Sequence, residues 1–320
     1  MVVLVGIDES IDPSLLLGFP DEAQLVRIPE SPDRQYAVDF WVAAMPPRIL
    51  RRQWPHLTGV KVIQAPWAGV DTLLNLFPPD VILCDGRGVH EIPTAEWAVA
   101  VILAVQKCLP FFITMQNVGK WAQGQQAQQN DAFLPTRIKD PPAPIRDLTG
   151  TTILIVGYGS IGQAVEARLT PFGVKFLRVA RTERDGVAGM NQLDDLLGDA
   201  DIVLLTAPLT SETKGMIDAQ RIMKMKEGAL LVNAARGRLV DTDALLHALQ
   251  RKKIRAALDV TDPEPLPADH PLWKAPNLLL TPHVGGDSEN FMARAFQLVR
   301  EQVERMVRGE PLLNIVTGEY

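Results

Sequence analysis

The chain has 320 residues, enough for two domains of ordinary size, each with its own core. Its composition, 47% hydrophobic and 22% charged, is typical of a globular protein, and no apolar run reaches the ~18 residues of a membrane span. The net charge of −6 argues against a nucleic acid or an anionic membrane as partner, so an anionic substrate must be captured by local cations.

The beginning of the chain predicts a buried strand. Met1–Glu9 has only a short apolar run before Asp8 and Glu9 and no basic n-region, unlike a signal peptide, so we expect a cytoplasmic protein. Cys84 and Cys108 lie in apolar stretches without metal or redox spacing. We therefore expect two reduced core cysteines and no metal site.

The first 90 residues alternate short apolar runs with polar or helical segments. Each run is bounded by Pro, Gly or Asp and predicts a buried strand. The runs are Met1–Ile7, Leu25–Ile28, Tyr36–Ala44, Val60–Gln64 and Val81–Cys84. Strands separated by connections of this length predict a parallel α/β sheet.

Two segments follow that differ from this pattern. Pro93–Val105 predicts a long apolar helix with proline at its start. Residues 119–150 are rich first in Gln and then in Pro, which predicts an extended connection. The segment is either a surface loop or an arm that contacts another subunit.

A second α/β unit begins at Thr151. The predicted helices are Ser160–Leu169, Asp241–Lys252 with an acidic start and a basic end, and a last helix from Ser288 to Arg308. The predicted strands are Thr151–Val156, Val174–Ala180, Ile202–Ala207, Ala229–Ala235, Ala256–Val260 and Leu278–Leu280.

A glycine-rich hexapeptide joins the first strand of this unit to its first helix. It consists of Gly157, Tyr158, Gly159, Ser160, Ile161 and Gly162. In the dinucleotide-binding fingerprint the first glycine permits a tight turn, the second admits a pyrophosphate, and the third allows close helix–strand packing. The helix N-terminus then offers N–H groups to the phosphates. We therefore predict a dinucleotide site rather than a turn without ligand.

The end of the next strand bears on the choice of cofactor. A carboxylate there would accept a hydrogen bond from the ribose 2′-hydroxyl of NAD. The sequence instead has Ala180, followed by Arg181, Thr182, Glu183 and Arg184. Removing the anion and adding cations favours the 2′-phosphate of NADP, although both arginines are also compatible with an ordinary solvated loop. NADP(H) is favoured over NAD(H).

Three later strands end in residues suited to one reaction. Arg236 follows the first of them in the stretch Asn233-Ala-Ala-Arg236-Gly237, Glu264 follows the second, and His283 follows the third. Carboxyl ends of parallel strands face the ligand crevice of an open α/β sheet. Each residue alone has an ordinary structural explanation. Their joint position after a phosphate-binding loop favours catalysis.

Reduction of a 2-oxo acid needs these three groups. Arg236 is predicted to hold the substrate carboxylate in a bidentate grip. His283 is predicted to protonate the carbonyl oxygen as hydride arrives, because an unperturbed imidazole titrates near pH 6.5. Glu264 on the other ring nitrogen would fix the ring and favour imidazolium.

The chain resembles the D-isomer-specific 2-hydroxyacid dehydrogenase family along nearly its whole length. The matching stretches are Ala65–Asp71, Pro93–Ala98, Val156–Gly162, Leu231–Leu246, Ala257–Trp273 and Leu279–Gly286. The resemblance implies a flavodoxin-like substrate domain (1–98 and 287–320), an inserted doubly wound Rossmann-type domain (99–286) and a homodimer. Formate dehydrogenases share this fold but have Gln at the position of Glu264.

The resemblance also assigns further residues. It implies the same catalytic trio and substrate-carboxylate binding around Ala68, Gly69 and Val70. It places Thr94 and Asp259 near the nicotinamide and Thr206, Ala207 and Pro208 near the adenosine. Ala234, Ala235 and Gly285, which lie in the matching stretches, complete the predicted cofactor-binding set.

Within the family, the Ala180-Arg181-Thr182 departure and the stretch Asp259–Pro267 look like the NADPH-preferring glyoxylate/hydroxypyruvate reductases. The expected reaction is reduction of glyoxylate or hydroxypyruvate. Trp67 and the Met45-Pro46-Pro47 loop either shape the pocket or serve only packing. One alternative is an NAD-dependent D-lactate or D-3-phosphoglycerate dehydrogenase, which would differ in cofactor. Another is a nucleotide-sensing, corepressor-like scaffold, which the absence of long interaction tails disfavours.

Overall fold

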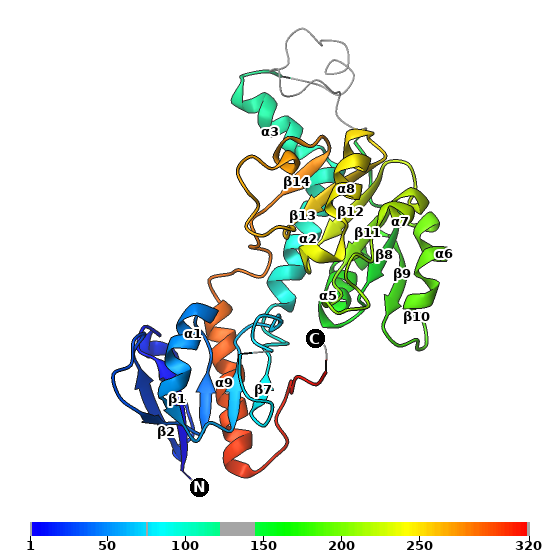
Figure 1. The fold of residues 1–320 in the computed structure, drawn as a ribbon. Coiled ribbons are helices and arrows are strands. Elements are labelled where there is room, and N and C mark those ends of the chain that lie inside the picture. The colour runs from blue at the N-terminus through cyan, green and yellow to red at the C-terminus, as the bar shows by residue number, and fades with distance from the viewer. Residues whose placement is uncertain (1, 75, 122–144, 319–320) are drawn as a thin grey trace. The chain divides into compact units, whose positions relative to one another are not determined.

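A computed structural model describes residues 2–74, 76–121 and 145–318, and the chain forms two compact units. Unit 1 consists of 1–93 and 286–320, and unit 2 of 94–285 (Figure 1). The sequence placed these boundaries at 98/99 and 286/287. In the structure the first boundary lies at 93/94, because Ala95 and Ala98 are fully buried in the core of unit 2. The helix Glu91–Gln106 therefore belongs to that unit from Thr94 onward.

Unit 1 is built on a five-stranded parallel sheet in the order β2-β1-β4-β6-β7, the strand order of flavodoxin-like folds. Its strands are β1 Val3–Asp8, β2 Ala23–Ile28, β4 Phe40–Val42, β6 Val62–Gln64 and β7 Ile82–Cys84. Side chains alternate between two cores. Phe40 and Val42 pack with helix α9 (Phe291–Arg308), whereas Trp41 packs with α1 (Pro47–Gln53) on the other face.

The predicted single strand Tyr36–Ala44 is wrong. The structure has β3 (Tyr36–Ala37), which pairs with β5 (Leu57–Thr58) in a separate two-stranded sheet, and then β4. Asp39 separates the two strands. Its carboxylate accepts a hydrogen bond from the Leu4 N–H at 3.0 Å and from Lys61 Nζ at 2.8 Å. These side-chain bonds turn the backbone from one sheet to the other.

Unit 2 is a seven-stranded parallel sheet in the order β10-β9-β8-β11-β12-β13-β14. The strands are β8 Thr152–Val156, β9 Lys175–Ala180, β10 Ala188–Gly189, β11 Ile202–Leu205, β12 Ala229–Asn233, β13 Ile254–Leu258 and β14 Leu278–Leu280. This is a doubly wound Rossmann-type order, whose direction reverses between β8 and β11. The fold class predicted from the sequence is confirmed.

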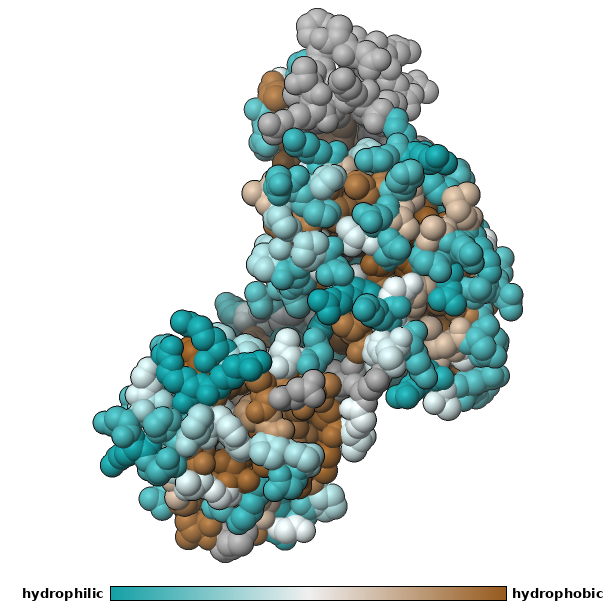
Figure 2. All heavy atoms as spheres, viewed as in Figure 1, coloured by the Kyte–Doolittle hydropathy of each residue, from teal (hydrophilic) through white to brown (hydrophobic). Residues whose placement is uncertain are grey.

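Helices cover both faces of this sheet. On one face α2 (Glu91–Gln106) and α5 (Ser160–Leu169) pack on Ile153 and Ile155 of β8. On the other face lie α6 (Leu193–Leu196), α7 (Ala219–Lys224) and α8 (Thr242–Gln250). Figure 2 shows mostly hydrophilic side chains over the viewed face of unit 2.

After α2 the chain turns into α3 (Leu109–Asn117). In the part of the chain that the structure describes, no single helix is long and apolar enough to cross a membrane. Only α2 and α3 together, bent by 69°, pass by length and composition. Most of the predicted 119–150 connection, residues 122–144, lies outside the described residues.

Candidate active site

The glycine loop (157–162) has the geometry of a phosphate-binding turn. Gly157 has φ +97°, and a Cβ there would lie 2.3 Å from the Ala207 nitrogen. At Gly162 a Cβ would lie 2.9 Å from the Ile155 side chain, because α5 packs closely on β8. A Cβ at Gly159 would lie 4.0 Å from the Gly157 oxygen, so this position faces open space. The loop therefore fits a pyrophosphate at Gly159.

An ion pair between β9 and α5 supports the glycine loop. Arg178 on β9 donates to both carboxylate oxygens of Glu166 on α5, at 2.7 and 2.5 Å, and its guanidinium lies 5.5 Å from the centre of the Tyr158 ring. The Arg178 guanidinium holds the pKa of the Glu166 carboxyl below its usual range. Strand, helix and glycine loop are thus tied together by one cation.

The end of β9 carries the residues predicted to choose between NAD and NADP. Ala180 is buried as the last residue of the strand, and Thr182 follows on the surface. Arg184 Nη2 donates to the Tyr158 carbonyl at 2.7 Å, which attaches it to the glycine loop. Arg181 is 76% exposed, with its Nε 4.0 Å from Glu212. Both guanidinium groups therefore lie beside the strand end from which the carboxylate is missing.

The segment Thr206–Pro208 follows β11, across the point where the strand order reverses. Thr206 Oγ1 donates to the Gly157 carbonyl at 2.9 Å, and Ala207 is buried against the glycine loop. Thr213 Oγ1 donates to the Pro208 carbonyl at 2.7 Å. These bonds hold the backbone of Thr206–Pro208, the segment predicted to lie near the adenosine, against Gly157.

Arg236 lies in a turn that the buried Asn233 organises at the end of β12. Asn233 Nδ2 donates to the Arg236 carbonyl at 2.9 Å, and its Oδ1 accepts from the Ala235 N–H at 3.1 Å. The guanidinium of the half-buried Arg236 donates to the Ala235 carbonyl at 2.8 Å, and Ala234 is also half-buried. A Cβ on Gly237 would lie 1.9 Å from the Thr261 oxygen, so this turn touches the loop after β13.

Asp259 orders the loop that carries His283. The carboxylate is buried and accepts hydrogen bonds from Thr281 Oγ1 at 2.6 Å, Val284 N–H at 3.0 Å and Gly285 N–H at 2.7 Å. Its backbone carbonyl accepts from the His283 N–H at 2.7 Å. Asp259 thus connects the end of β13 to the loop after β14.

His283 and Glu264 form a direct pair. His283 Nδ1 lies 2.5 Å from Glu264 Oε1, and the two side chains are 48% and 39% exposed. His283 has φ +57°, a left-handed conformation that is uncommon outside glycine and that recurs at functional sites. The contact predicted from the sequence is therefore present.

The remaining predicted residues fall in two places. Thr94 is buried in α2 of unit 2. Ala68 and Gly69 are half-buried and Val70 is fully buried, after β6 of unit 1. Among the described residues, no three His, Cys, Asp or Glu side chains cluster as metal ligands, and both cysteines are buried free thiols.

Three supporting residues were not singled out from the sequence. Asn233 and Thr281 carry the bonds described above, and Trp97 Nε1 donates to Thr281 Oγ1 at 3.0 Å. An Asn at the end of an apolar strand was a usable signal, because a buried amide needs partners. Trp97 gave no signal, since its partner lies 184 residues away.

The chain belongs to a known enzyme family. The open α/β fold, the glycine loop and the Arg, Glu and His residues at the same sheet edge are those of a nicotinamide-dependent oxidoreductase. Residues 111–285 match the family model "D-isomer specific 2-hydroxyacid dehydrogenase, NAD binding domain". The chain is a member of the D-isomer-specific 2-hydroxyacid dehydrogenases, which are oxidoreductases acting on 2-hydroxy acids.

Characterised relatives carry names within this chemistry. The chain is 35% identical to a glyoxylate reductase of Pyrococcus horikoshii, over 88% of this chain and 84% of the relative. It is 34% identical to human glyoxylate reductase/hydroxypyruvate reductase, over 79% and 76%. The match covers a smaller share of some other relatives. The match to the D-3-phosphoglycerate dehydrogenase of Methanocaldococcus jannaschii spans 47% of that protein.

Solved structures share the fold over the whole chain. A D-isomer-specific 2-hydroxyacid dehydrogenase from Xanthobacter autotrophicus, in complex with NADPH and MES, superposes with a TM-score of 0.76 at 26% identity. The comparison covers 99% of this chain and 98% of that one.

Proposed function

We propose that this chain reduces glyoxylate or hydroxypyruvate with NADPH. The observation that carries the proposal is the His283–Glu264 pair, which lies at the same sheet edge as Arg236 and the glycine loop. The names of the two reductase relatives support the substrate class.

Arg236, His283 and Glu264 each have a separate role in the reaction. The bound cofactor supplies the hydride. Arg236 binds the substrate carboxylate and orients the keto carbon, since a guanidinium presents two parallel donors to a carboxylate. His283 donates a proton to the substrate carbonyl oxygen, and Glu264 on Nδ1 fixes the ring so that Nε2 is the donor. The strained backbone at His283 sets the direction of that donor.

The preference for NADPH rests on the end of β9. Ala180 leaves no carboxylate to repel a 2′-phosphate, and Arg181 and Arg184 supply positive charge beside it. The bond from Arg184 to the Tyr158 carbonyl fixes one of these charges on the glycine loop. The Xanthobacter neighbour, which was solved with NADPH, supports the same choice.

The homodimer belongs to this proposal as well. On and just after α3, Leu109 is 47%, Ile113 55% and Trp121 88% exposed. Large apolar side chains gathered on one element are typical of a protein interface, and a second copy of the chain would cover them. The cytoplasmic location stays a prediction from the sequence.

Initial rates on a panel of 2-oxo acids test the proposal. Glyoxylate, hydroxypyruvate, pyruvate and phosphohydroxypyruvate are each assayed with NADPH and with NADH. We expect glyoxylate or hydroxypyruvate with NADPH to give the highest kcat/KM, by about tenfold or more over NADH. A tenfold preference for NADH would contradict the role of Arg181 and Arg184. Turnover of none of the four acids would favour the scaffold alternative.

A further inference from the structure

The carboxyl edge of the unit 1 sheet carries a single Lys or Arg. The four residues that follow each of its five strands are 9–12, 29–32, 43–46, 65–68 and 85–88, all within the described chain. Arg87 is the one basic residue among them, whereas the acidic ones are Glu9, Asp12, Glu30 and Asp85. Ligands of open α/β sheets bind outside this edge. Arg87 is therefore the guanidinium that these five loops offer to an anion.

Arg87 lies beside the loop predicted to hold the substrate carboxylate. The Gly86 N–H donates to the Trp67 carbonyl at 2.8 Å. A Cβ on Gly86 would lie 2.4 Å from the Pro66 oxygen, so the loops after β6 and β7 touch through their backbones. Ala68–Val70 follow Trp67 directly, and Arg87 follows Gly86 directly.

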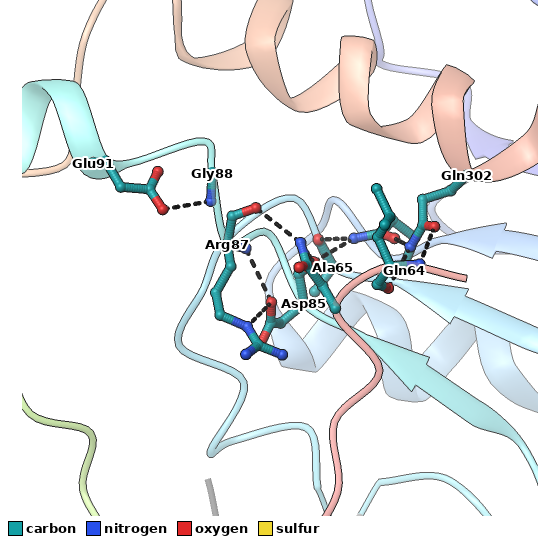
Figure 3. Close-up of polar contacts among 9 residues, drawn as sticks. Gln64, Ala65, Asp85, Arg87, Gly88, Glu91 and Gln302 are labelled. Carbon is teal, nitrogen blue, oxygen red and sulfur yellow. Dashed lines mark hydrogen bonds and ion pairs between the residues drawn. The ribbon is translucent and has the colours of Figure 1, made fainter. Parts of the chain in front are cut away.

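A buried carboxylate orients the Arg87 side chain. Asp85 is fully buried and accepts from Arg87 Nε at 3.1 and 3.0 Å and from the Arg87 N–H at 2.9 Å. The Arg87 side chain is 50% exposed, and in the described part of the chain neither terminal nitrogen has a hydrogen-bond partner. Figure 3 shows both of these nitrogens pointing away from the polar network behind Asp85.

That network holds the loop rigid. Gln64 Nε2 donates to the Asp85 carbonyl at 2.8 Å and Gln302 Nε2 donates to Gln64 at 2.9 Å, both within the buried sheet edge (Figure 3). Asn314 Nδ2 donates to the Arg87 carbonyl at 2.8 Å. Residues of helix α9 and of the C-terminal segment thus hold the backbone around Arg87 in place through hydrogen bonds. A side chain held in this way loses little freedom when it binds a ligand.

We infer that Arg87 is a second substrate-binding guanidinium, which binds the carboxylate of the 2-oxo acid together with the backbone of Ala68–Val70. This inference rests on the proposed function and adds a residue to its substrate site on unit 1. The competing role for Arg87 is to neutralise the buried Asp85 and nothing more.

Binding of oxalate, an unreactive analogue of a 2-oxo acid, separates these roles without requiring turnover. The Kd is measured by calorimetry in the presence of saturating NADP+ for the full chain and its variants. Arg87→Met should raise the Kd about ten- to a hundredfold, the cost of losing hydrogen bonds from a charged group, with the Kd of NADP+ unchanged. Arg87→Lys should recover part of the affinity, because lysine keeps the positive charge but lacks the paired N–H donors of the guanidinium. Arg308→Met, which removes an ion-paired arginine at the end of α9, is the matched control.

The double variant Asp85→Asn/Arg87→Met decides between the roles. It removes the buried charge together with its partner, so a purely neutralising Arg87 predicts oxalate affinity restored to that of the wild type. Direct binding predicts that the Kd stays as high as in Arg87→Met. Restored affinity, or an Arg87→Met Kd within about twofold of the wild type, overturns the inference. Failure of the proposed function would appear elsewhere, as wild-type protein that turns over none of the 2-oxo acids.

Discussion

His283 is held by three separate contacts before any substrate binds. Its ring contacts Glu264, and its backbone N–H donates to the Asp259 carbonyl. The N–H groups of the next two residues, Val284 and Gly285, donate to the Asp259 carboxylate. Each contact comes from the loop after β13, the neighbouring strand. The direction of the imidazole is therefore a property of the folded loop pair and does not depend on the substrate.

Replacing this imidazole should damage catalysis without damaging cofactor binding. We expect His283→Ala to lower kcat by about 10²- to 10⁴-fold, the usual contribution of a general acid. The Kd of NADPH should stay within about twofold, because among the described residues the hydrogen bonds of His283 go to Glu264 and Asp259 and not to the glycine loop. Steady-state rates and fluorescence titration of NADPH measure the two quantities.

The matched control is His247→Ala, which removes an exposed histidine from α8 in the same unit. It should leave kcat unchanged. A His283→Ala variant with kcat within about tenfold of the wild type would remove the assigned role.

At the scale of the element, two glycines of the β8–α5 turn have different roles: Gly157 permits close backbone packing, and Gly159 leaves space for the pyrophosphate. Gly157→Ala should destabilise the protein by about 2 kcal/mol or more, since φ is +97° and the added methyl meets backbone at 2.3 Å. Gly159→Ala should change the free energy of unfolding by less than about 0.5 kcal/mol, because its φ of −99° suits alanine and the methyl meets open space. The same methyl should raise the Kd of NADPH at least about tenfold by occupying the pyrophosphate position.

Urea unfolding and NADPH titration of both variants check this separation. Unchanged NADPH affinity in Gly159→Ala would mean that the loop serves only the packing of α5. Normal stability in Gly157→Ala would contradict the tight approach of β8 and the segment after β11.

The elements that the sequence predicted best are those fixed by local pattern. Ser160–Leu169 and Leu278–Leu280 have the predicted bounds, because the glycine loop and flanking polar residues mark their ends. The Tyr36–Ala44 run failed because its division depends on Asp39 bonding to Leu4 and Lys61, which are distant in sequence.

The candidate site shows the same division. The Glu264–His283 contact followed from strand order and the chemistry that a proton donor needs. The hydrogen bonds that Asp259 accepts from the loop after β14, and the bond from Trp97 to Thr281, depend on tertiary packing that no spacing in the chain records. Parallel sheets thus make strand-end residues predictable and leave their supporting contacts to the structure.

At the scale of the whole molecule, each unit has its own large parallel sheet and its own pair of hydrophobic cores. The cores of unit 1 form around β1, β4 and β6, and those of unit 2 around β8, β11 and β12. The chain passes from one unit to the other at 93/94 and again at 285/286. Units with separate cores can unfold in separate transitions.

Calorimetric unfolding with and without NADP+ should therefore show two transitions, of which only one depends on the ligand. The glycine loop and the end of β9 belong to unit 2, so NADP+ at about a hundred times its Kd should stabilise that unit by about 2.7 kcal/mol and raise its Tm. The transition of unit 1 should not move. Gly159→Ala, which keeps the fold and weakens cofactor binding about tenfold or more, should reduce this stabilisation to about 1.4 kcal/mol or less. One cooperative transition that moves as a whole with NADP+ would show instead that the two units unfold together.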